Sequence, residues 1–475
     1  PRRTHASTTS WKSATQLDGA MGGGGGAGGR GGGSPVTAEA GPATGALGAS
    51  CPPGGAGAGA GTGAGAEGRS VWGQAVARAA GGLGRGAVGK VQAVLTEVVK
   101  VSGGAPCLRR HALRCGRERI YPASCVKVAA AAAALNRLAG LRALAGAPDL
   151  SVWTGLTFSR TRDPAGAAAE ASTSLGLLLR RVFLLSCNES HNLLLDFAGR
   201  AHANALLASA GVDVRLLGSL GDGRGPPRSP ARHVEVLASG RPFSVRLDDP
   251  DGALEADTAG IGAPWTLGRA HVTSTGCLVK EPLQMGSKSC ASLVALQDLI
   301  IRLLRPDLAG AEEEWLLDDA EAPTPGPALQ AGPPEADGNF FGLDPRDAAF
   351  LSEAMAETCP GAPPLPGSEG LPEDYNKFFL RGLRESLGPH VSVRSKLGQA
   401  YGFSLDTAHV VWEDGPRGPR EFFLAASVYT NANGVLNDDQ YEYESEGEPV
   451  LEAVARAAGE VVLRSAGLTA PNDTS

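Results

Sequence analysis

The sequence lacks the patterns that mark metal proteins, nucleic-acid-binding proteins and membrane proteins. Its eight cysteines form no C-x-x-C pair and no Cys/His ligand spacing, so we expect free thiols, no metal and no cofactor. Lysine and arginine are outnumbered by aspartate and glutamate, 43 to 50, and form no basic stripe, which argues against a nucleic-acid partner. No apolar run reaches the roughly 18 residues of a membrane span. A small-molecule substrate is the partner that remains, and no pattern indicates an oligomeric state.

Large apolar side chains are almost missing from residues 21–70, where glycine and alanine dominate. Such a segment cannot bury enough surface to offset its chain entropy, so residues 1–70 are predicted to be a disordered, low-complexity N-terminal segment. The first 17 residues hold Arg2, Arg3 and Lys12 among serines and threonines and no acidic residue, which is the balance of a transit peptide. This favours a soluble protein directed to an organelle, and the rest of the sequence leaves the compartment open.

From Val71 onward, large apolar residues recur at helix and strand periods, which predicts one domain over 71–468 and a tail over 469–475. Two stretches rich in proline, glycine and acidic residues, near 309–338 and 359–373, are expected to be surface insertions. Strands are predicted at Val91–Val101, Arg117–Tyr121, Ala400–Glu413 and Arg420–Thr430, the last two forming a hairpin. Helices are predicted at Ser124–Leu138, Leu175–Leu185, Ser190–Gly199, Ala201–Ala210 and Leu293–Leu304, and over the run with Val450, Val454, Ala457 and Val461. Strands at both ends with helices between them predict the α+β class.

A serine and a lysine lie three positions apart where a helix is predicted to begin. Ser124 and Lys127 form an S-x-x-K motif, and side chains at this spacing share one helix face. A serine hydroxyl is a weak nucleophile until a base removes its proton, and a lysine in a desolvated site can be that base. About one such motif arises by chance in a chain of this length, so its meaning depends on its neighbours.

Two further motifs follow it along the chain. Ser186 and Asn188 form S-x-N just before an apolar helix, and a serine there is suited to pass a proton to a leaving amine, while the amide can hold a substrate carbonyl. Lys396 and Gly398 form K-x-G at the opening of the predicted hairpin, with Gln399 next to them. A lysine and an approachable backbone at that place can bind a carboxylate.

S-x-x-K, S-x-N and K-x-G in this order resemble the pattern of class A β-lactamases and penicillin-binding proteins. The segments that carry the resemblance are Tyr121–Lys127 (YPASCVK), Ser186–Gly199 (SCNESHNLLLDFAG), Lys396–Phe403 (KLGQAYGF) and Glu421–Asp439 (EFFLAASVYTNANGVLNDD). Outside the insertions, the resemblance covers Val91–Leu463. It implies a β-lactamase/transpeptidase-like fold, in which an antiparallel sheet is flanked by helices and carries an inserted helical subdomain.

The resemblance also implies a role for each motif residue. Ser124 is the nucleophile that is acylated, Lys127 is its base, and Ser186 carries a proton to the leaving nitrogen. Lys396 completes the catalytic group, while Asn188, Gly398 and Gln399 bind the substrate. The backbone N–H groups of Ser124 and Gln399 form the oxyanion hole.

Three substitutions and one missing residue leave the reaction open. Cys187, Leu397 and Gln399 stand where the family has an acid, a threonine and a small hydroxyl residue. No clear loop supplies the glutamate that activates the deacylating water, and Glu281, in a Glu-Pro dipeptide, is only a weak candidate. The sequence therefore allows a β-lactamase-like serine hydrolase, an acylating enzyme of penicillin-binding, peptidase or esterase type without efficient deacylation, and a non-catalytic binding module.

A Ser/His/Asp triad is the rival way to activate a serine, but no G-x-S-x-G turn surrounds Ser124. His191 follows Ser186 closely, and His409 lies inside a predicted strand. Both are expected to be hydrogen-bonded structural residues. The lysine-based mechanism is therefore preferred.

Overall fold

The computed structural model describes residues 70–81, 91–100, 105–115, 120–159, 171–221, 230–238, 241–247, 265–308, 310–317 and 339–468. The chain divides into two compact units, Pro1–Glu67 and Gly68–Ser475, and every described residue belongs to the second. The predicted disorder of residues 1–70 concerns, apart from Ser70, residues outside the described ranges, and so does the tail over 469–475.

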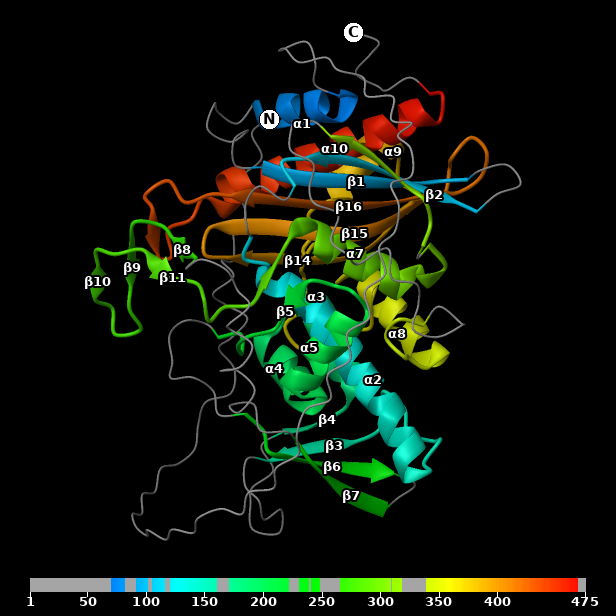
Figure 1. The fold of residues 1–475 in the computed structure, drawn as a ribbon, viewed down its shortest axis with the longest axis vertical. Helices are drawn as coiled ribbons and strands as arrows, with labels where there is room; N and C mark the ends of the chain where they lie inside the picture. The colour runs from blue at the N-terminus through cyan, green and yellow to red at the C-terminus, as the bar shows by residue number, and fades with distance from the viewer. Residues whose placement is uncertain are drawn as a thin grey trace, which may run out of the picture. The chain divides into compact units, whose positions relative to one another are not determined.

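The central sheet has six strands in the order β13-β2-β1-β16-β15-β14 (Figure 1). The strands are β1 (Val91–Val99), β2 (Cys107–Leu113), β13 (Glu313–Leu317), β14 (Val391–Ala400), β15 (Phe403–Trp412) and β16 (Arg420–Tyr429). Neighbours are antiparallel except β13, which pairs with β2 in parallel. Most residues of β1, β15 and β16 are buried because helices cover both faces of the sheet.

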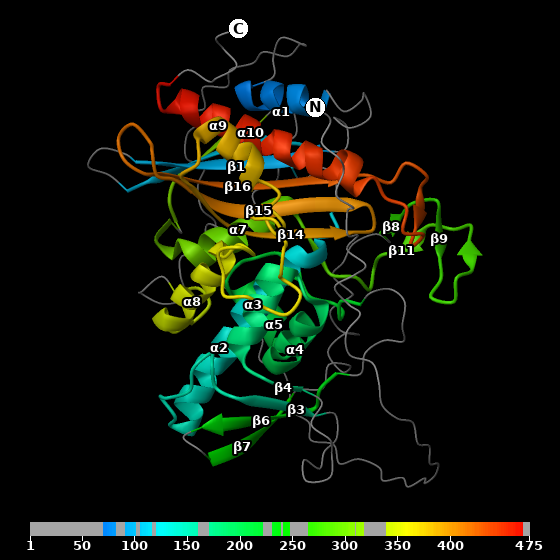
Figure 2. The same cartoon turned by 180° about the vertical axis from the view of Figure 1, so that it is seen from behind.

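One face of the sheet is covered by α1 (Val71–Gly81), α9 (Leu380–Leu387) and α10 (Glu448–Ser465) (Figure 2). The apolar residues of α10 that recur at helical spacing, Val450, Val454, Ala457 and Val461, are all buried in one cluster with side chains of the sheet. A short π-helical turn, η5 (Tyr443–Gly447), leads into α10. The predicted last helix is therefore confirmed, with its apolar stripe against the sheet.

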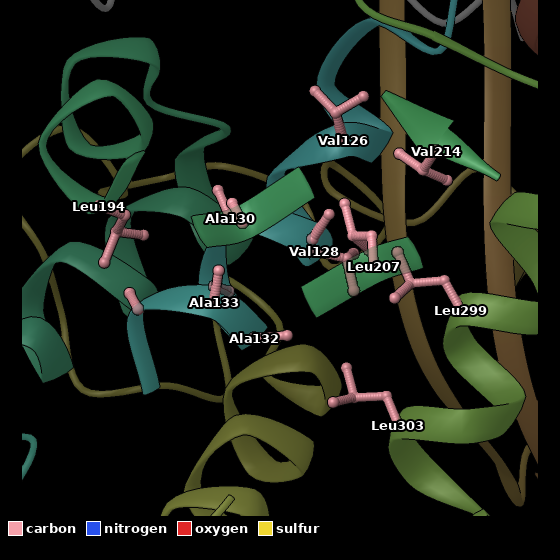
Figure 3. Packing of buried hydrophobic residues seen from close by; sticks show 14 of the residues in the cluster. Val126, Val128, Ala130, Ala132, Ala133, Leu194, Leu207, Val214, Leu299 and Leu303 are labelled. Atoms are coloured by element: carbon pink, nitrogen blue, oxygen red, sulfur yellow. The ribbon is translucent and has the colours of Figure 1, made fainter. Parts of the chain in front are cut away.

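The other face carries α7 (Leu293–Leu304), α8 (Pro345–Ala356) and the helical subdomain. In that subdomain η2 (Ala123–Val126) leads into α2 (Lys127–Ala145), which packs among α3 (Leu175–Leu185), α4 (Asn188–Ala198) and α5 (Arg200–Ser209). Figure 3 shows Leu194 of α4 and Leu207 of α5 in the apolar cluster around α2. Residues 128–135 are at most 1% exposed, because small side chains let neighbours approach α2 from every side. Among the described residues, Ala123–Leu144 is long and apolar enough to cross a membrane, but 72% of its most apolar window is buried inside the molecule.

Short strands complete the described chain. One sheet has the order β4-β3-β6-β7 and lies at the far end of α2 from the central sheet, and three smaller sheets are β10-β9-β17, β11-β8 and β12-β5. Their bounds are β3 (Leu156–Ser159), β4 (Ala171–Thr173), β5 (Val214–Arg215), β6 (His233–Ala238), β7 (Arg241–Arg246), β8 (Thr266–Leu267), β9 (Ala270–Val272), β10 (Leu278–Val279), β11 (Leu283–Gln284), β12 (Cys290–Ala291) and β17 (Val435–Leu436), with a 3-10 turn, η4 (Pro306–Leu308), after α7.

The α+β class and the sheet flanked by helices with a helical subdomain are confirmed. The predicted strand at Arg117–Tyr121 is wrong in its described part, where Ile120 makes only an isolated bridge to Ala291, and β2 lies earlier in the chain. Lys396 does not open the strand predicted to begin at Ala400, because it lies within β14, a strand of its own.

The two predicted insertions are not purely surface features. In the first, Glu313–Leu317 forms β13 and extends the central sheet beyond β2, while 318–338 lie outside the described residues. In the second, Cys359 and Leu365 are buried against Leu184 of α3. A few apolar side chains in a proline-rich stretch are enough to anchor it to the domain.

Candidate active site

Ser124 lies on η2, at the corner between the preceding extended chain and α2. Ala123 before it has a φ of 44°, a region that residues with a Cβ rarely adopt. The N–H of Cys125 donates to the carbonyl of Pro122 at 2.9 Å and closes the turn. Strain of this kind costs about 1–3 kcal/mol and persists only where surrounding contacts hold it. The half-buried Ser124 is thus held by a constrained backbone.

Lys127 is the first residue of α2 and is completely buried. Its Nζ donates to Oδ1 of Asn188 at 2.7 Å, to Oγ of Ser186 at 3.2 Å and to the backbone carbonyl of Ser186. Burial lowers the pKa of Lys127 well below its ordinary value, and the positive charge of Lys396 lowers it further. The three acceptors oppose this shift, because they suit an ammonium group. The result is a fixed amine that releases its proton more easily than an exposed lysine does.

Ser186 lies between two helices, α3 and α4, with φ and ψ of 53° and 33°. This left-handed conformation ends α3 and lets Cys187 begin the next helix as N-cap, its Sγ accepting from the N–H of Ser190. Oγ of Ser186 accepts from Nζ of Lys127 at 3.2 Å and from Nζ of Lys396 at 2.9 Å. A hydroxyl that accepts twice keeps its own proton for another partner. Ser186 is therefore arranged as a proton donor.

Lys396 reaches this serine from β14 and is 1% exposed. Its Nζ also donates to the carbonyl of Leu397 at 2.7 Å, and burial lowers its pKa to about 8. The Sγ of Cys125 donates to the carbonyl of Lys396 at 2.9 Å. This bond joins β14 to η2, so the strand that carries Lys396 and the turn that carries Ser124 hold one another in place.

Gly398 lies directly against the backbone of Ser124. A Cβ at this position would come within 2.8 Å of the backbone nitrogen of Ser124, 3.0 Å of Cβ of Ala123 and 3.1 Å of the carbonyl of Pro122. Such distances leave no room for a side chain. The glycine therefore lets β14 pass close beside the nucleophile.

The side chain of Gln399 is directed away from this cluster. Its Nε2 donates to Oε1 of Glu448 in α10 at 3.0 Å and to Oγ of Ser404 at 3.3 Å. Alternate residues of a strand face opposite sides of the sheet, so Gln399 and Lys396 lie on opposite faces. What Gln399 can offer a substrate at Ser124 is its backbone N–H.

The structure thus brings together six of the seven residues proposed from the sequence. Hydrogen bonds link Lys127, Ser186, Asn188 and Lys396, and backbone packing brings Gly398 to Ser124. Among the hydrogen bonds of the described residues, none joins the side chains of Ser124 and Lys127. Catalytic hydrogen bonds are often long in a ligand-free enzyme and tighten when the substrate binds.

The two histidines differ in their surroundings. Nε2 of His409 lies 2.5 Å from Oε1 of Glu421, so the expected structural role fits its position. His191 is 1% exposed in α4, and its Nδ1 has no hydrogen-bond partner within the described part of the chain. Burial and the nearby Lys127 and Lys396 hold the pKa of His191 well below its ordinary value. A neutral imidazole without a bond to Ser124 or to a carboxylate forms no triad.

A backbone segment that no sequence motif indicates lies against α4. Oδ1 of Asn192 accepts from the N–H of Leu220 at 2.9 Å, and Nδ2 of Asn192 donates to the carbonyl of Leu220 at 2.8 Å. Nδ2 of Asn188 approaches the carbonyl of Gly221 at 3.5 Å. The spacing of Asn188 and Asn192, one helical turn apart, was the available signal, but nothing in the sequence indicates the partner of Asn192, which lies 28 residues further on.

Two aromatic residues, one just before η2 and one just after β14, also contact each other near the site. The rings of Tyr121 and Tyr401 pack edge to face with centroids 4.9 Å apart, and Nζ of Lys288 lies 5.6 Å from the Tyr401 ring. Tyr121 precedes η2 and Tyr401 follows β14. These contacts join the two segments that carry Ser124 and Lys396 a second time.

The chain has an α+β fold in which S-x-x-K, S-x-N and K-x-G converge at one place, as the sequence resemblance to class A β-lactamases and penicillin-binding proteins implies. Among solved structures it is similar to the class A β-lactamase of the last common ancestor of Gram-negative bacteria (16% identity, 83% of this chain, 100% of that one, TM-score 0.42). It is also similar to PBP-A in an acyl-enzyme complex with penicillin G (13%, 83%, 96%, 0.41) and to a β-lactamase from Sphaerobacter thermophilus (14%, 83%, 97%, 0.39).

No family model matches the chain, and no curated protein matches it in sequence. At the identities and TM-scores of the solved structures, the likeness concerns the general fold and says nothing of the chemistry. The function must therefore come from the side chains of this chain.

Proposed function

We propose that this protein is a serine enzyme that forms an acyl-enzyme on Ser124 with a β-lactam or a related amide or ester. The observation that carries the proposal is the shared hydroxyl of Ser186, which accepts from the two buried amines of Lys127 and Lys396 beside the backbone of Ser124. Two buried amines that are both linked to one hydroxyl are costly to maintain for stability alone.

The acylation step follows from these positions. Lys127 takes the proton of the Ser124 hydroxyl as Oγ attacks the substrate carbonyl carbon, and the carbonyl oxygen gains the negative charge. The N–H groups of Ser124 and Gln399 stabilise that oxyanion. As the C–N bond breaks, Ser186 donates its proton to the leaving nitrogen and recovers one from the amines that surround it.

Substrate binding falls to the remaining residues. Nζ of Lys396 offers a positive charge for an acidic group of the substrate, and Nδ2 of Asn188 lies beside the carbonyl of Gly221. A substrate carboxylate would gain a charge-assisted hydrogen bond from Lys396. The preferred substrates are therefore cyclic or peptide-like amides and esters that carry an acidic group.

The substitutions that favoured a non-catalytic module do not disturb this arrangement. Cys187 caps α4 through its Sγ, and Leu397 is 1% exposed on the face of the sheet opposite Lys396. Gln399 has its side chain bonded to Glu448 of α10. None of the three side chains enters the hydrogen bonds of Lys127 and Lys396, since Leu397 contributes only its backbone carbonyl, and this supports the enzyme over the binding module.

The test is intact-mass measurement after incubation with penicillin G and, separately, with a cephalosporin. One covalent acyl group per chain is expected on the wild type, none on Ser124→Ala, and one on the control Ser209→Ala, an exposed serine at the end of α5. Absence of an adduct on the wild type with either compound, or an adduct that persists on Ser124→Ala, would show the proposal to be wrong.

A further inference from the structure

We propose that Asp406 determines which of the two amines at Ser186 carries the proton, because its buried carboxylate keeps Lys396 charged and leaves Lys127 neutral. Asp406 lies on the other face of the sheet and acts through Lys396, so it is a positioning residue and not a catalytic one. The inference rests on the proposed acylation of Ser124. It gives the two amines separate tasks, since a neutral Lys127 can take the proton of Ser124 and a charged Lys396 can bind the acidic group of the substrate.

Asp406 lies on β15, beside the part of β14 that carries Lys396. In the register of the two strands, Asp406 pairs with Leu397, the residue next to Lys396. Ala408, two residues further along β15, is buried among side chains of α9 and α10, so Asp406 lies on that face and Lys396 on the face of Ser186. Nζ of Lys396 turns back to the strand and donates to the carbonyl of Leu397 at 2.7 Å. The amine is therefore held at the ladder position that Asp406 occupies on the other strand.

The carboxyl group of Asp406 is completely buried and only partly satisfied by hydrogen bonds. Its Oδ2 accepts from the N–H of Phe378 at 3.0 Å, whereas its Oδ1 has no hydrogen-bond partner within the described part of the chain. Lys377 is buried too, and its Nζ donates to the carbonyl of Met355 at 2.7 Å. Burial raises the pKa of Asp406, and the charges of Lys377 and Lys396 lower it. Nearby cations, more than hydrogen bonds, therefore stabilise the ionised carboxylate.

The two amines at Ser186 differ in their relation to this carboxylate. Burial lowers the pKa of Lys396, and Asp406 is among the groups that raise it again. Lys127 lies in α2 and donates its hydrogen bonds to Ser186 and Asn188. Burial lowers the pKa of Lys127, and the charge of Lys396 lowers it further. An ionised Asp406 therefore holds a proton on Lys396, and that charge in turn keeps Lys127 neutral.

Other titratable and charged groups around this pair do not take over the role of Asp406. Besides Lys127 and Lys377, they are Cys125 of η2, His191 of α4, Arg394 of β14 and Glu448 of α10. Burial raises the pKa of Cys125 and lowers that of His191, so both are uncharged near neutral pH. Arg394 is a cation, and Glu448 is bonded to the side chain of Gln399 at 3.0 Å. Within the described ranges, Asp406 is thus the carboxyl group that lies next to Lys396.

The experiment measures acylation by penicillin G and by its methyl ester, which lacks the carboxylate, in the wild type, Asp406→Asn and the matched control Glu448→Gln. Both substitutions turn a carboxyl group into an amide on the α9 and α10 side of the sheet. Intact mass at quenched time points and several substrate concentrations gives a dissociation constant and a saturating acylation rate for each compound. The pH is about 8, where Asp406 is ionised because burial raises its pKa to about 7.

Asp406→Asn is expected to impair the two compounds in different ways, because the proton then resides mainly on Lys127. Penicillin G must draw that proton to Lys396 when it binds, so its dissociation constant should rise about tenfold while its saturating rate changes little. The ester binds without that transfer but meets a protonated Lys127, so its dissociation constant should stay the same and its saturating rate should fall about tenfold. Glu448→Gln should leave all these values as in the wild type.

The outcomes separate this inference from the proposed function. If Asp406→Asn lowers the saturating rate equally with both compounds, or changes neither compound, Asp406 does not direct the proton and the inference is wrong while acylation stands. If no adduct forms on the wild type with penicillin G, the proposed function itself fails. Should Asp406→Asn not fold, Asp406→Ser, which is smaller and equally uncharged, is tested in the same way, and the same difference between the compounds is expected.

Discussion

Lys127 and Lys396, which are 269 positions apart in the chain, donate hydrogen bonds to one and the same oxygen, Oγ of Ser186, at 3.2 and 2.9 Å. Two buried amines on one hydroxyl repel each other whenever both are protonated. The arrangement therefore favours a state in which one of the two is neutral and ready to accept a proton.

Replacing Lys127 by methionine is expected to separate stability from activity. The substitution removes the desolvation cost of a buried amine but leaves its acceptors on Ser186 and Asn188 without that donor, so the unfolding temperature should fall only modestly. Acylation by penicillin G should slow by about 10²–10⁴-fold because the base is lost. Intact-mass measurements at quenched time points and thermal unfolding test both parts. A variant that acylates at the wild-type rate would remove Lys127 from the mechanism.

Adding one methyl group at Gly398 is expected to displace the nucleophile. A Cβ there meets the backbone nitrogen of Ser124 at 2.8 Å, so Gly398→Ala should cost about 1–3 kcal/mol in free energy of unfolding and slow acylation at least tenfold. The control is Gly140→Ala in α2, where a Cβ meets nothing within 4 Å. That change should stabilise the protein by about 0.5–1 kcal/mol and leave acylation unchanged. Equal effects of the two variants would contradict the close approach of β14.

Truncating Gln399 is expected to leave acylation almost intact. The side chain bonds to Glu448 and Ser404, away from the lysine cluster, so Gln399→Ala keeps the N–H that we assign to the oxyanion hole. The acylation rate should change less than about threefold, while the helix α10 loses a contact worth about 1 kcal/mol. Rates measured with saturating penicillin G decide this, and a loss of about 10²-fold would mean that the side chain itself reaches the substrate.

The stability of the protein is expected to fall as pH rises from about 4 to 7, in a way that depends on Asp406. Burial raises the pKa of this carboxyl from 3.8 to about 7, against the lowering effect of Lys377 and Lys396. In this window the unfolded chain releases the proton that the folded chain retains, so Asp406 stabilises the fold fully below about pH 4 and loses that contribution through about pH 7.

Asp406→Asn provides the comparison, because an amide does not titrate. Urea unfolding of the wild type and of this variant at about pH 4.5 and about pH 7.5 measures the difference in free energy of unfolding. The wild type should lose a few kcal/mol more than the variant between the two values. Parallel changes would mean that Asp406 is already ionised in the folded protein at the lower pH.

Those parts of the site and the fold that depend on residues close together in the sequence could be predicted from the sequence. Ser124 and Lys127 are near in sequence, and the helix that follows them forms from its own alanine-rich composition. Leu175–Leu185 and Leu293–Leu304 have the bounds that their apolar periodicity predicts. In each case a short stretch of chain carries its own structural signal.

Contacts that depend on tertiary structure could not be predicted in this way. The orientation of Gln399 depends on β14 being a separate edge strand, which its mixed sequence did not reveal. The contact between Asn192 and Leu220 joins a helix to a loop with no motif. β13 lies inside a stretch that composition assigns to the surface, and only its pairing with β2 makes it a strand.

The six consecutive alanines at residues 129–134 affect how substitutions elsewhere in the protein can alter its reactivity. Alanine side chains are too small to fix the position of this helix by interlocking with its neighbours. The position of the helix is therefore set by larger residues packed against it, such as Leu194, Leu207 and Leu299 (Figure 3). Since Lys127 is the first residue of that helix, substitutions on three other helices can shift the amine by fractions of an ångström. Reactivity in this protein is thus open to adjustment from positions that never touch a substrate.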